Sequence, residues 1–249
     1  MKTRMPIVMF ILITLLLTSC SVLTNVGVKV ITPSDKVINE NRNVSGFSSI
    51  QFSTLGKVNI IMGDTESLNI SGPDNLVPEI ITTVNNGTLV IRQKENLTVT
   101  SLGSTNMLTF TIVAKELTSL TLSGVGDVQV EALTTPKMDI TMSGAGKLTQ
   151  NQLTTENLNI NISGLGGIDI TGQATQATIN ISGAGGVNAP DLQLKTANVT
   201  ISGLGSATLW ITDQLTGDIS GGGSVSYYGN PTTNSKTTGL GTFKSLGNK

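Results

Sequence analysis

Apolar and polar residues alternate in short runs through the second half of the chain, and each run ends at a corner residue, usually serine. One position before the serines stand Leu122, Met142, Ile162, Ile181, Ile201 and Ile219. Three positions before them stand Leu120, Ile140, Ile160, Ile179, Val199 and Gly217, and between these lie Thr121, Thr141, Asn161, Asn180, Thr200 and Asp218. This period of two predicts strands that bury one face and expose the other.

A second strand follows each serine. Five residues after it come Val128, Leu148, Ile168, Val187, Ala207 and Val225, and seven residues after it come Val130, Gln150, Ile170, Ala189, Leu209 and Tyr227. A Ser-Gly-x-Gly corner joins the two strands. We expect its glycines to adopt positive φ, or to lie so close to the next coil that no Cβ fits. They are Gly124, Gly126, Gly144, Gly146, Gly164, Gly166, Gly183, Gly185, Gly203 and Gly205.

The corners recur at a nearly constant interval. They begin at Ser123, Ser143, Ser163, Ser182, Ser202, Ser220 and Thr238, at spacings of 20, 20, 19, 20, 18 and 18 residues. Such a period is typical of a solenoid in which each repeat stacks on the last. The sequence therefore predicts an all-β fold, a single-stranded parallel β-helix with 18–20 residues per coil and about ten coils. Right-handedness follows by analogy with parallel crossovers.

The first half follows the same pattern less regularly. Ile50 and Phe52 precede Ser53, and Val58 and Ile60 follow it at the same offsets. Residues 68–76 predict a further coil with a changed corner, and residues 84–91 predict a turn leading into a strand. Irregular terminal coils are expected, because an end coil must cover the core without offering a free edge.

The N-terminus has the pattern of a bacterial lipoprotein signal. Lys2 and Arg4 precede an apolar run over residues 7–17, and Leu17-Thr18-Ser19-Cys20 resembles a lipobox, whose cysteine is lipidated. We expect residues 1–19 to be a signal peptide, residues 20–45 the lipidated N-terminus and tether, and residues 46–249 the β-helix head domain. The alternatives are an ordinary secretory signal with a chance cysteine, and an uncleaved anchor, which needs about 20 apolar residues.

Composition narrows the range of functions. Residues 1–19 contain two of the 15 basic residues and none of the 16 acidic ones, so removing them leaves 13 minus 16, a charge of −3. This charge is too mild to imply a nucleic-acid partner. Cys20 is the only cysteine, which excludes an intrachain disulfide. No histidine is present, which removes the commonest general base and metal ligand.

Acidic residues do not line up for catalysis. Cleavage of a glycan needs paired carboxylates, but the candidates stand at different offsets from their serines; they are Asp127, Asp139, Asp169, Asp191 and Asp218. The sequence therefore predicts no catalytic residue, no metal site and no cofactor, and the protein is not expected to be an enzyme.

Two groups of outward residues are candidates for contacts. Asn161 and Asn180 should be vertical neighbours that share amide hydrogen bonds. Trp210 and Tyr228 each lie eight residues after their serine, so we expect an outward aromatic pair. The pair suits a sugar platform or a subunit contact. The plainer alternative is that it packs under residues 229–231 as a cap.

Three sequence runs resemble the head GIN domain family. They are Ser71-Gly72-Pro73-Asp74-Asn75-Leu76, then Asn86-Gly87-Thr88-Leu89-Val90-Ile91, then the repeated Leu-x-Leu/Ile-x-x-Ser-Gly-Ala/Val/Leu-Gly. The resemblance covers residues 41–249, although Ser71 and Pro73 replace the more acidic corner expected there. It implies a parallel β-helix in a family of adhesin heads that are secreted or lipid-anchored in Gram-negative bacteria. It offers no established activity and no catalytic residues.

Together these observations predict a noncatalytic, lipid-anchored protein of the cell envelope, placed in the outer membrane, that serves in adhesion, as a scaffold or as a ligand-binding element. The expected partners are the membrane through Cys20 and an envelope protein or glycan, with an oligomer formed through the C-terminal coil. The alternatives are a carbohydrate-active β-helix enzyme, either a polysaccharide lyase or a hydrolase, and a purely structural envelope component.

Overall fold

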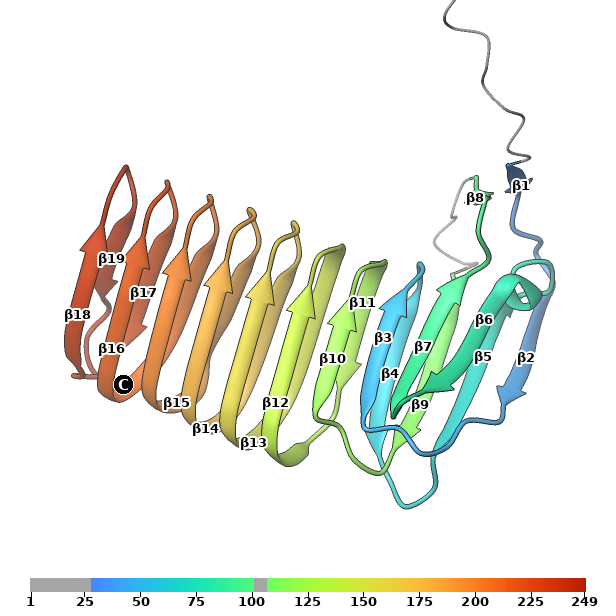
Figure 1. Cartoon of the computed structure of the whole chain (residues 1–249), viewed down its shortest axis with the longest axis horizontal. Coiled ribbons are helices and arrows are strands. Elements are labelled where there is room, and N and C mark those ends of the chain that lie inside the picture. Colours follow the sequence, from blue (N-terminus) through green and yellow to red (C-terminus); the bar gives the residue numbers. More distant parts are fainter. Residues whose placement is uncertain (1–27, 101–106) are drawn as a thin grey trace, which may run out of the picture.

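The protein is a long β-solenoid, shown by a computed structural model that describes residues 28–100 and 107–249 (Figure 1). This confirms the predicted fold class. Its regular part consists of β10 (Ser119–Leu122), β11 (Val125–Val130), β12 (Leu133–Met142), β13 (Ala145–Ile162), β14 (Gly167–Ile181), β15 (Gly186–Ile201), β16 (Ser206–Ile219), β17 (Ser224–Tyr228), β18 (Thr232–Thr237) and β19 (Thr242–Ser245). Among the described residues, no helix has the length and apolar character needed to cross a membrane.

The N-terminal part contains the remaining elements. They are β1 (Lys29–Ile31), β2 (Val37–Arg42), β3 (Ser49–Ser53), β4 (Lys57–Met62), β5 (Ser67–Pro73), the short 3-10 helix η1 (Val77–Glu79), β6 (Ile80–Asn85), β7 (Thr88–Gln93), β8 (Leu97–Val99) and β9 (Thr109–Ala114). All strands except β1 and β8 belong to one continuous sheet that winds around the core.

Like residues stack on like residues along the regular coils. The inward ladder runs Leu122, Met142, Ile162, Ile181, Ile201 and Ile219, all paired in parallel register. Each of these side chains is buried. On the outward face, Asn180 Nδ2 donates to Asn161 Oδ1 over 3.0 Å, as the pattern predicts. In this strand of each coil, the period of two therefore places apolar residues inside and polar residues outside.

The order of coils in space differs from the order in sequence. The coil built from β3 and β4 pairs with β10 and β11, so that Phe52 faces Leu122 and Val58 faces Val128. The offsets around Ser53 are therefore confirmed. Residues 63–118 are inserted between these two coils in the chain, and they build the N-terminal end of the stack, where β7 and β9 add parallel strands to β3 and β4.

Beyond β7 and β9 the strands reverse. β6 pairs antiparallel with β7, and β5 pairs antiparallel with β9 and with β2. The prediction of another parallel coil over residues 68–76 is therefore wrong, and the regular stack has about 6 turns instead of ten. Between β6 and β7 the cause is local, because Asn86 and Gly87 adopt φ of 48° and 74° and make the two-residue hairpin turn that joins these two strands.

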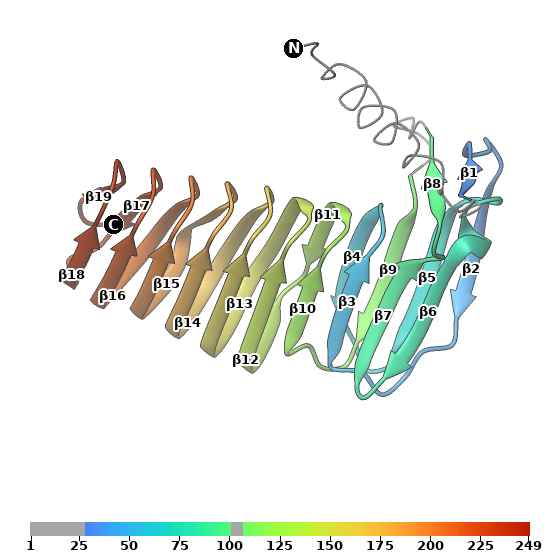
Figure 2. The same ribbon diagram turned by 45° about the horizontal axis from the view of Figure 1, so that its top comes forward.

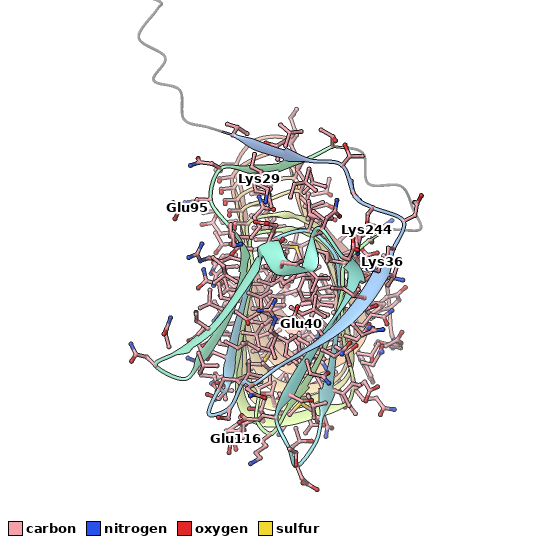
Figure 3. The ribbon with its side chains drawn as sticks, turned by 90° about the vertical axis from the view of Figure 1, so that its right-hand side faces the viewer. Lys29, Lys36, Glu40, Glu95, Glu116 and Lys244 are labelled. Carbon is pink, nitrogen blue, oxygen red and sulfur yellow. The ribbon has the colours of Figure 1, made fainter. Side chains whose placement is uncertain are left out.

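Part of the predicted tether belongs to the fold. Residues 37–42 form β2, which hydrogen-bonds along β5, and β1 pairs with β8. The expectation that residues 20–45 are all tether is corrected for these two strands. β2 buries little apolar surface, since its residues alternate only between exposed and half-exposed, so the hydrophobic pattern does not reveal it. Figure 3 looks along the axis at this end, where β2, with Glu40, crosses the stack.

The corner glycines are required mainly by the next coil. A Cβ on Gly164 would overlap the carbonyl oxygen of Gly144 far inside contact distance, and φ of Gly164 is not left-handed. Gly126 combines both causes, because its φ is 151° and a Cβ there would overlap the carbonyl oxygen of Gly56. Of the two predicted reasons for glycine, close approach between coils is therefore the more general.

Candidate functional site

A groove of about 620 Å³ runs along the solenoid. It lies where each coil bends, just before the strand that leads to the next Ser-Gly-x-Gly corner. We call it the lateral groove. Its lining comes from five successive strands: Thr134, Thr135 and Pro136 of β12, Thr154, Thr155 and Glu156 of β13, Gln173, Ala174 and Thr175 of β14, Gln193 and Lys195 of β15, and Thr212 and Asp213 of β16.

Threonine hydroxyls fix the bend that forms the groove. Thr135 and Thr155 are buried, and each donates its hydroxyl to the backbone carbonyl two residues ahead, at Lys137 over 3.1 Å and at Asn157 over 3.3 Å. Such local side-chain bonds compete with the regular ladder and favour turns. The residue that follows each threonine is then exposed at the edge of the groove.

One outward row of the groove is continuous across six coils. Thr134 faces Thr154, Thr154 faces Gln173, and Gln173 faces Gln193. The row then continues through Trp210 to Tyr228. Neighbouring members lie about 4.8 Å apart along the axis. Within the groove this row presents a regular ladder of hydroxyl and amide groups, and beyond the groove lining it ends on two aromatic rings.

The groove carries both signs of charge. Glu156 follows Thr155, which pairs with Ala174, and Lys195 follows Leu194, which also pairs with Ala174. The two charged residues therefore stand two coil steps, about 10 Å, apart along the axis. Among residues 28–100 and 107–249, neither Glu156 nor Lys195 has an ion-pair partner. Asp213 accepts a hydrogen bond from the Thr212 hydroxyl over 2.6 Å. The groove is thus polar but nearly neutral.

The carboxylates of the groove are far apart for hydrolysis. Three coil steps separate Glu156 from Asp213, which corresponds to about 14 Å along the axis. Glycoside hydrolysis needs the two carboxyl groups at about 5–10 Å. The arrangement fits hydrogen bonding to a ligand better than acid-base cleavage of one.

The aromatic pair is covered by the C-terminal residues. Trp210 and Tyr228 are paired neighbours, both half-buried, and the Lys249 ammonium lies 5.2 Å and 5.7 Å from their ring centroids. Lys249 also contacts the carbonyl oxygen of Pro190 and the carboxylate of Asp191. The contact therefore comes from Lys249 and not from residues 229–231 of the predicted cap, and the sugar platform, the subunit contact and the cap all stay predictions for this pair.

The other predicted site residues lie apart from the groove. Cys20 is outside the described residues. Asp139 accepts from Asn159 Nδ2 over 2.8 Å and pairs with Lys137, while Asp169 pairs with Lys147 over 2.5 Å and raises the pKa of that lysine. Within the described ranges, no cluster of three or more metal-ligating side chains occurs.

Sequence reasoning missed the lateral groove, although part of it was visible. Leu133-Thr134-Thr135 and Leu153-Thr154-Thr155 both begin ten residues after their serines, which marks a threonine ladder. The later coils hide the pattern, because bulges shift the register between Gln150 and Leu153 and between Ala189 and Gln193. Counting from the serine therefore fails beyond these bulges.

Comparison with known proteins gives a consistent result. A family model described as "Putative auto-transporter adhesin, head GIN domain" matches residues 46–231. A crystal structure of a "putative adhesin" from Bacteroides fragilis is 30% identical, covers 87% of this chain and 100% of its own, and has a TM-score of 0.83.

Two more distant structures share the fold. A "putative adhesin" from Parabacteroides merdae is 22% identical, with coverage of 88% and 99% and a TM-score of 0.69. A "Putative lipid binding protein" from Parabacteroides distasonis is 20% identical, with coverage of 88% and 100% and a TM-score of 0.67. No curated protein matches the chain.

Proposed function

Because the chain belongs to the head GIN domain family, we propose that it is a noncatalytic adhesin-like protein of the cell envelope, anchored through an acylated Cys20, that binds an extended glycan in the lateral groove. The observation that carries the binding proposal is the outward row from Thr134 to Gln193, which places hydroxyl and amide groups at the coil spacing along an open groove.

The chemistry of this row suits a carbohydrate. Threonine and glutamine side chains offer both donors and acceptors, so they can match the hydroxyl groups of successive sugars without selecting a charge. A spacing of about 4.8 Å is close to the length of one sugar residue in an extended chain. The near neutrality of the groove favours a neutral or zwitterionic glycan over a polyanion.

The anchor and the location rest on the N-terminus and on the family. Residues 7–17 and the Leu17-Thr18-Ser19-Cys20 run fit a lipoprotein signal, and two acyl chains on one cysteine with a third on its amino group are sufficient for stable anchoring. The family model and the 30% identical structure from Bacteroides fragilis are both described as putative adhesins, which supports a surface role in the envelope. Placement in the outer membrane is part of the proposal.

Binding of envelope polysaccharides to a groove variant tests the function. In the variant Gln173→Ala with Gln193→Ala, two exposed amides leave the groove, and each hydrogen bond contributes about 1 kcal/mol. We expect the affinity for a glycan identified on an array to fall about tenfold or more in titration calorimetry. The matched control, Gln129→Ala with Asn198→Ala, removes two exposed amides outside the groove and should leave affinity unchanged.

Two outcomes would contradict the proposal. Equal affinity of both double variants would separate binding from the groove and leave a structural role. Release of reducing ends or unsaturated products from the bound polysaccharide would establish the carbohydrate-active enzyme instead.

A further inference from the structure

The middle residues of the Ser-Gly-x-Gly corners form an exposed apolar row along one edge of the solenoid. We call it the corner ridge; its apolar side chains are those of Val125, Ala145, Leu165, Ala184, Leu204 and Leu240, and Gly222 holds the position between the last two. Val125 is 60% exposed, Leu165 and Leu204 are each 74% exposed, and Leu240 is 90% exposed. Single exposed leucines are ordinary, but exposed apolar side chains that recur at every second corner along one edge indicate an interaction surface.

The corner ridge is held in place by its own backbone. Leu165 N donates to Gly144 O over 3.3 Å, and Leu204 N donates to Gly183 O over 3.1 Å, so each corner is hydrogen-bonded to the one before it. The glycines permit this close stacking. Leu165, Leu204 and Leu240 stand two coils apart, at intervals of about 10 Å along the axis.

The ridge is also free of charge. The seven corners over residues 123–126, 143–146, 163–166, 182–185, 202–205, 220–223 and 238–241 contain only Ser, Thr, Gly, Ala, Val and Leu. A partner that meets this edge therefore encounters apolar tips flanked by small residues, and no charged side chain of the corners has to be desolvated.

The ridge faces the side on which the described chain begins. Figures 1 and 2 show the corners as a row of tight loops along one edge, with β1 on the same edge beyond the end of the row. Val28 and Val30, at the start of the described chain, are exposed apolar residues too. The eight residues from Cys20 to Gly27 span at most about 28 Å, so an acylated Cys20 keeps this end close to its bilayer.

We propose that the corner ridge lies on the bilayer that holds the acyl chains of Cys20, with Leu165, Leu204 and Leu240 inserted at its surface. This inference rests on the lipid anchor of the proposed function. A second copy of the chain fits the ridge less well, because the row is one residue wide and a stable dimer needs about 800 Å² from each partner. A bilayer accepts a single line of apolar tips.

This orientation turns the lateral groove away from the membrane. Residues 137–142 separate Pro136 of the groove from the corner that begins at Ser143, a strand of about 20 Å. Groove and ridge therefore lie at opposite edges of the solenoid. The anchored protein lies along the membrane and presents the groove to ligands outside it.

Fluorescence quenching by membrane-embedded nitroxides tests the orientation. The full acylated chain is reconstituted in vesicles of phosphatidylethanolamine and phosphatidylglycerol that contain nitroxide-labelled phospholipid. An environment-sensitive dye is attached to Leu204→Cys on the ridge or, as the matched control, to Gln173→Cys in the groove. We expect blue-shifted emission and strong quenching at position 204, and neither at position 173.

Further arms separate the ridge from the anchor. Adding Leu165→Ser with Leu240→Ser to Leu204→Cys should abolish the quenching while the melting temperature stays unchanged, since both leucines are exposed. Equal quenching at positions 204 and 173 in a protein of acylated mass would overturn the ridge proposal alone, as would a cross-linked dimer through position 204 without quenching. If the mature protein carries no acyl mass, and Cys20→Ala does not change this, both the anchor and this inference are overturned.

Discussion

At the scale of single residues, neighbouring coils restrict the sequence more than local backbone preference does. Gly164 could adopt its own φ with a side chain, but the carbonyl oxygen of Gly144 occupies the space that a Cβ needs. Glycine is therefore selected by a contact some twenty residues away in sequence. The same reasoning explains why the x position between the glycines tolerates Val, Ala and Leu, since that side chain points away from the stack.

A pair of glycine substitutions checks this account. Gly164→Ala must displace the corner from its hydrogen-bonded neighbour, and we expect a loss of about 1–3 kcal/mol in the free energy of unfolding. Gly167→Ala, three residues further on, meets no atom within 4 Å and should be neutral or slightly stabilising. Denaturant titration measures both, and equal stability of the two variants would show that coil contact does not select the corner glycines.

Gln150 shows a second residue-level effect that pattern reading does not anticipate. It stands in an inward ladder between Val130 and Ile170 and is buried. Its Nε2 donates to Glu131 O over 2.8 Å and to Asn151 O over 3.0 Å, which ties down the backbone just before Gln152, whose φ is 50°. This polar residue in the core therefore marks a turn whose backbone carbonyl groups need hydrogen-bond donors. The inward ladder continues through Gln150 to Ile170.

At the scale of elements, the regular coils follow from the sequence and the N-terminal end does not. The pairing register of each regular strand can be predicted from its sequence, because Ile, Val and Leu recur at fixed offsets from a corner serine. β5 has the same alternation, with Leu68 and Ile70 before Ser71, but it pairs antiparallel with β2 and β9, and the pattern does not encode that direction. β2 has no buried alternation, and it is held by backbone hydrogen bonds to β5 at the end of the stack. The groove falls between these cases, because its threonine repeat is readable but its later members follow bulges.

One charged residue links two elements of the N-terminal end, η1 and β1, and the segment that follows β7. Glu79, at the end of η1, accepts a hydrogen bond from Lys29 of β1 over 2.6 Å and pairs with Lys94 over 3.3 Å. The Lys29 ammonium is the main reason that the pKa of Glu79 lies below its ordinary value of 4.5. β1 has only β8 as a sheet partner, so this contact matters for its attachment.

Lowering the pH should therefore weaken the attachment of β1 to the rest of the fold. A carboxylate with a lowered folded pKa stabilises the fold fully above its unfolded value of 4.5, and that contribution is lost as the pH falls through the lower folded value. We expect hydrogen exchange of the β1 amides, corrected for its intrinsic pH dependence, to rise below pH 4.5 in the wild type. Glu79→Gln should show the raised exchange already at neutral pH, and Glu95→Gln should match the wild type. Exchange that is insensitive to both pH and Glu79→Gln would mean that β1 is held by other contacts.

At the scale of the whole molecule, the two ends of the solenoid close in different ways. The N-terminal end reverses its strands and covers the core with β2 and β5, whereas the C-terminal end keeps the parallel pairing to its last coil. In that coil the inward positions opposite Leu215, Gly217 and Ile219 are Thr233, Ser235 and Thr237. This inward ladder thus ends in hydroxyl groups, whereas the other inward ladder ends in Phe243, opposite Val225. Polar residues at the last coil make the sheet edge less favourable for the addition of another coil.

The oligomer expected through the C-terminal coil stays a prediction, and the hydroxyl positions show how an end-to-end contact can be tested. Thr233→Leu with Thr237→Leu extends the apolar ladder to the exposed end, where burying two leucines between copies is favourable by about 1.5–3 kcal/mol per side chain. We expect light scattering of the detergent-solubilised protein to show monomers for the wild type and end-to-end dimers for this variant. The control Thr232→Leu with Asn234→Leu adds the same side chains at outward positions and should remain monomeric. A wild type that is already dimeric, and that Thr233→Asp dissociates, would show instead that the polar coil is itself the interface.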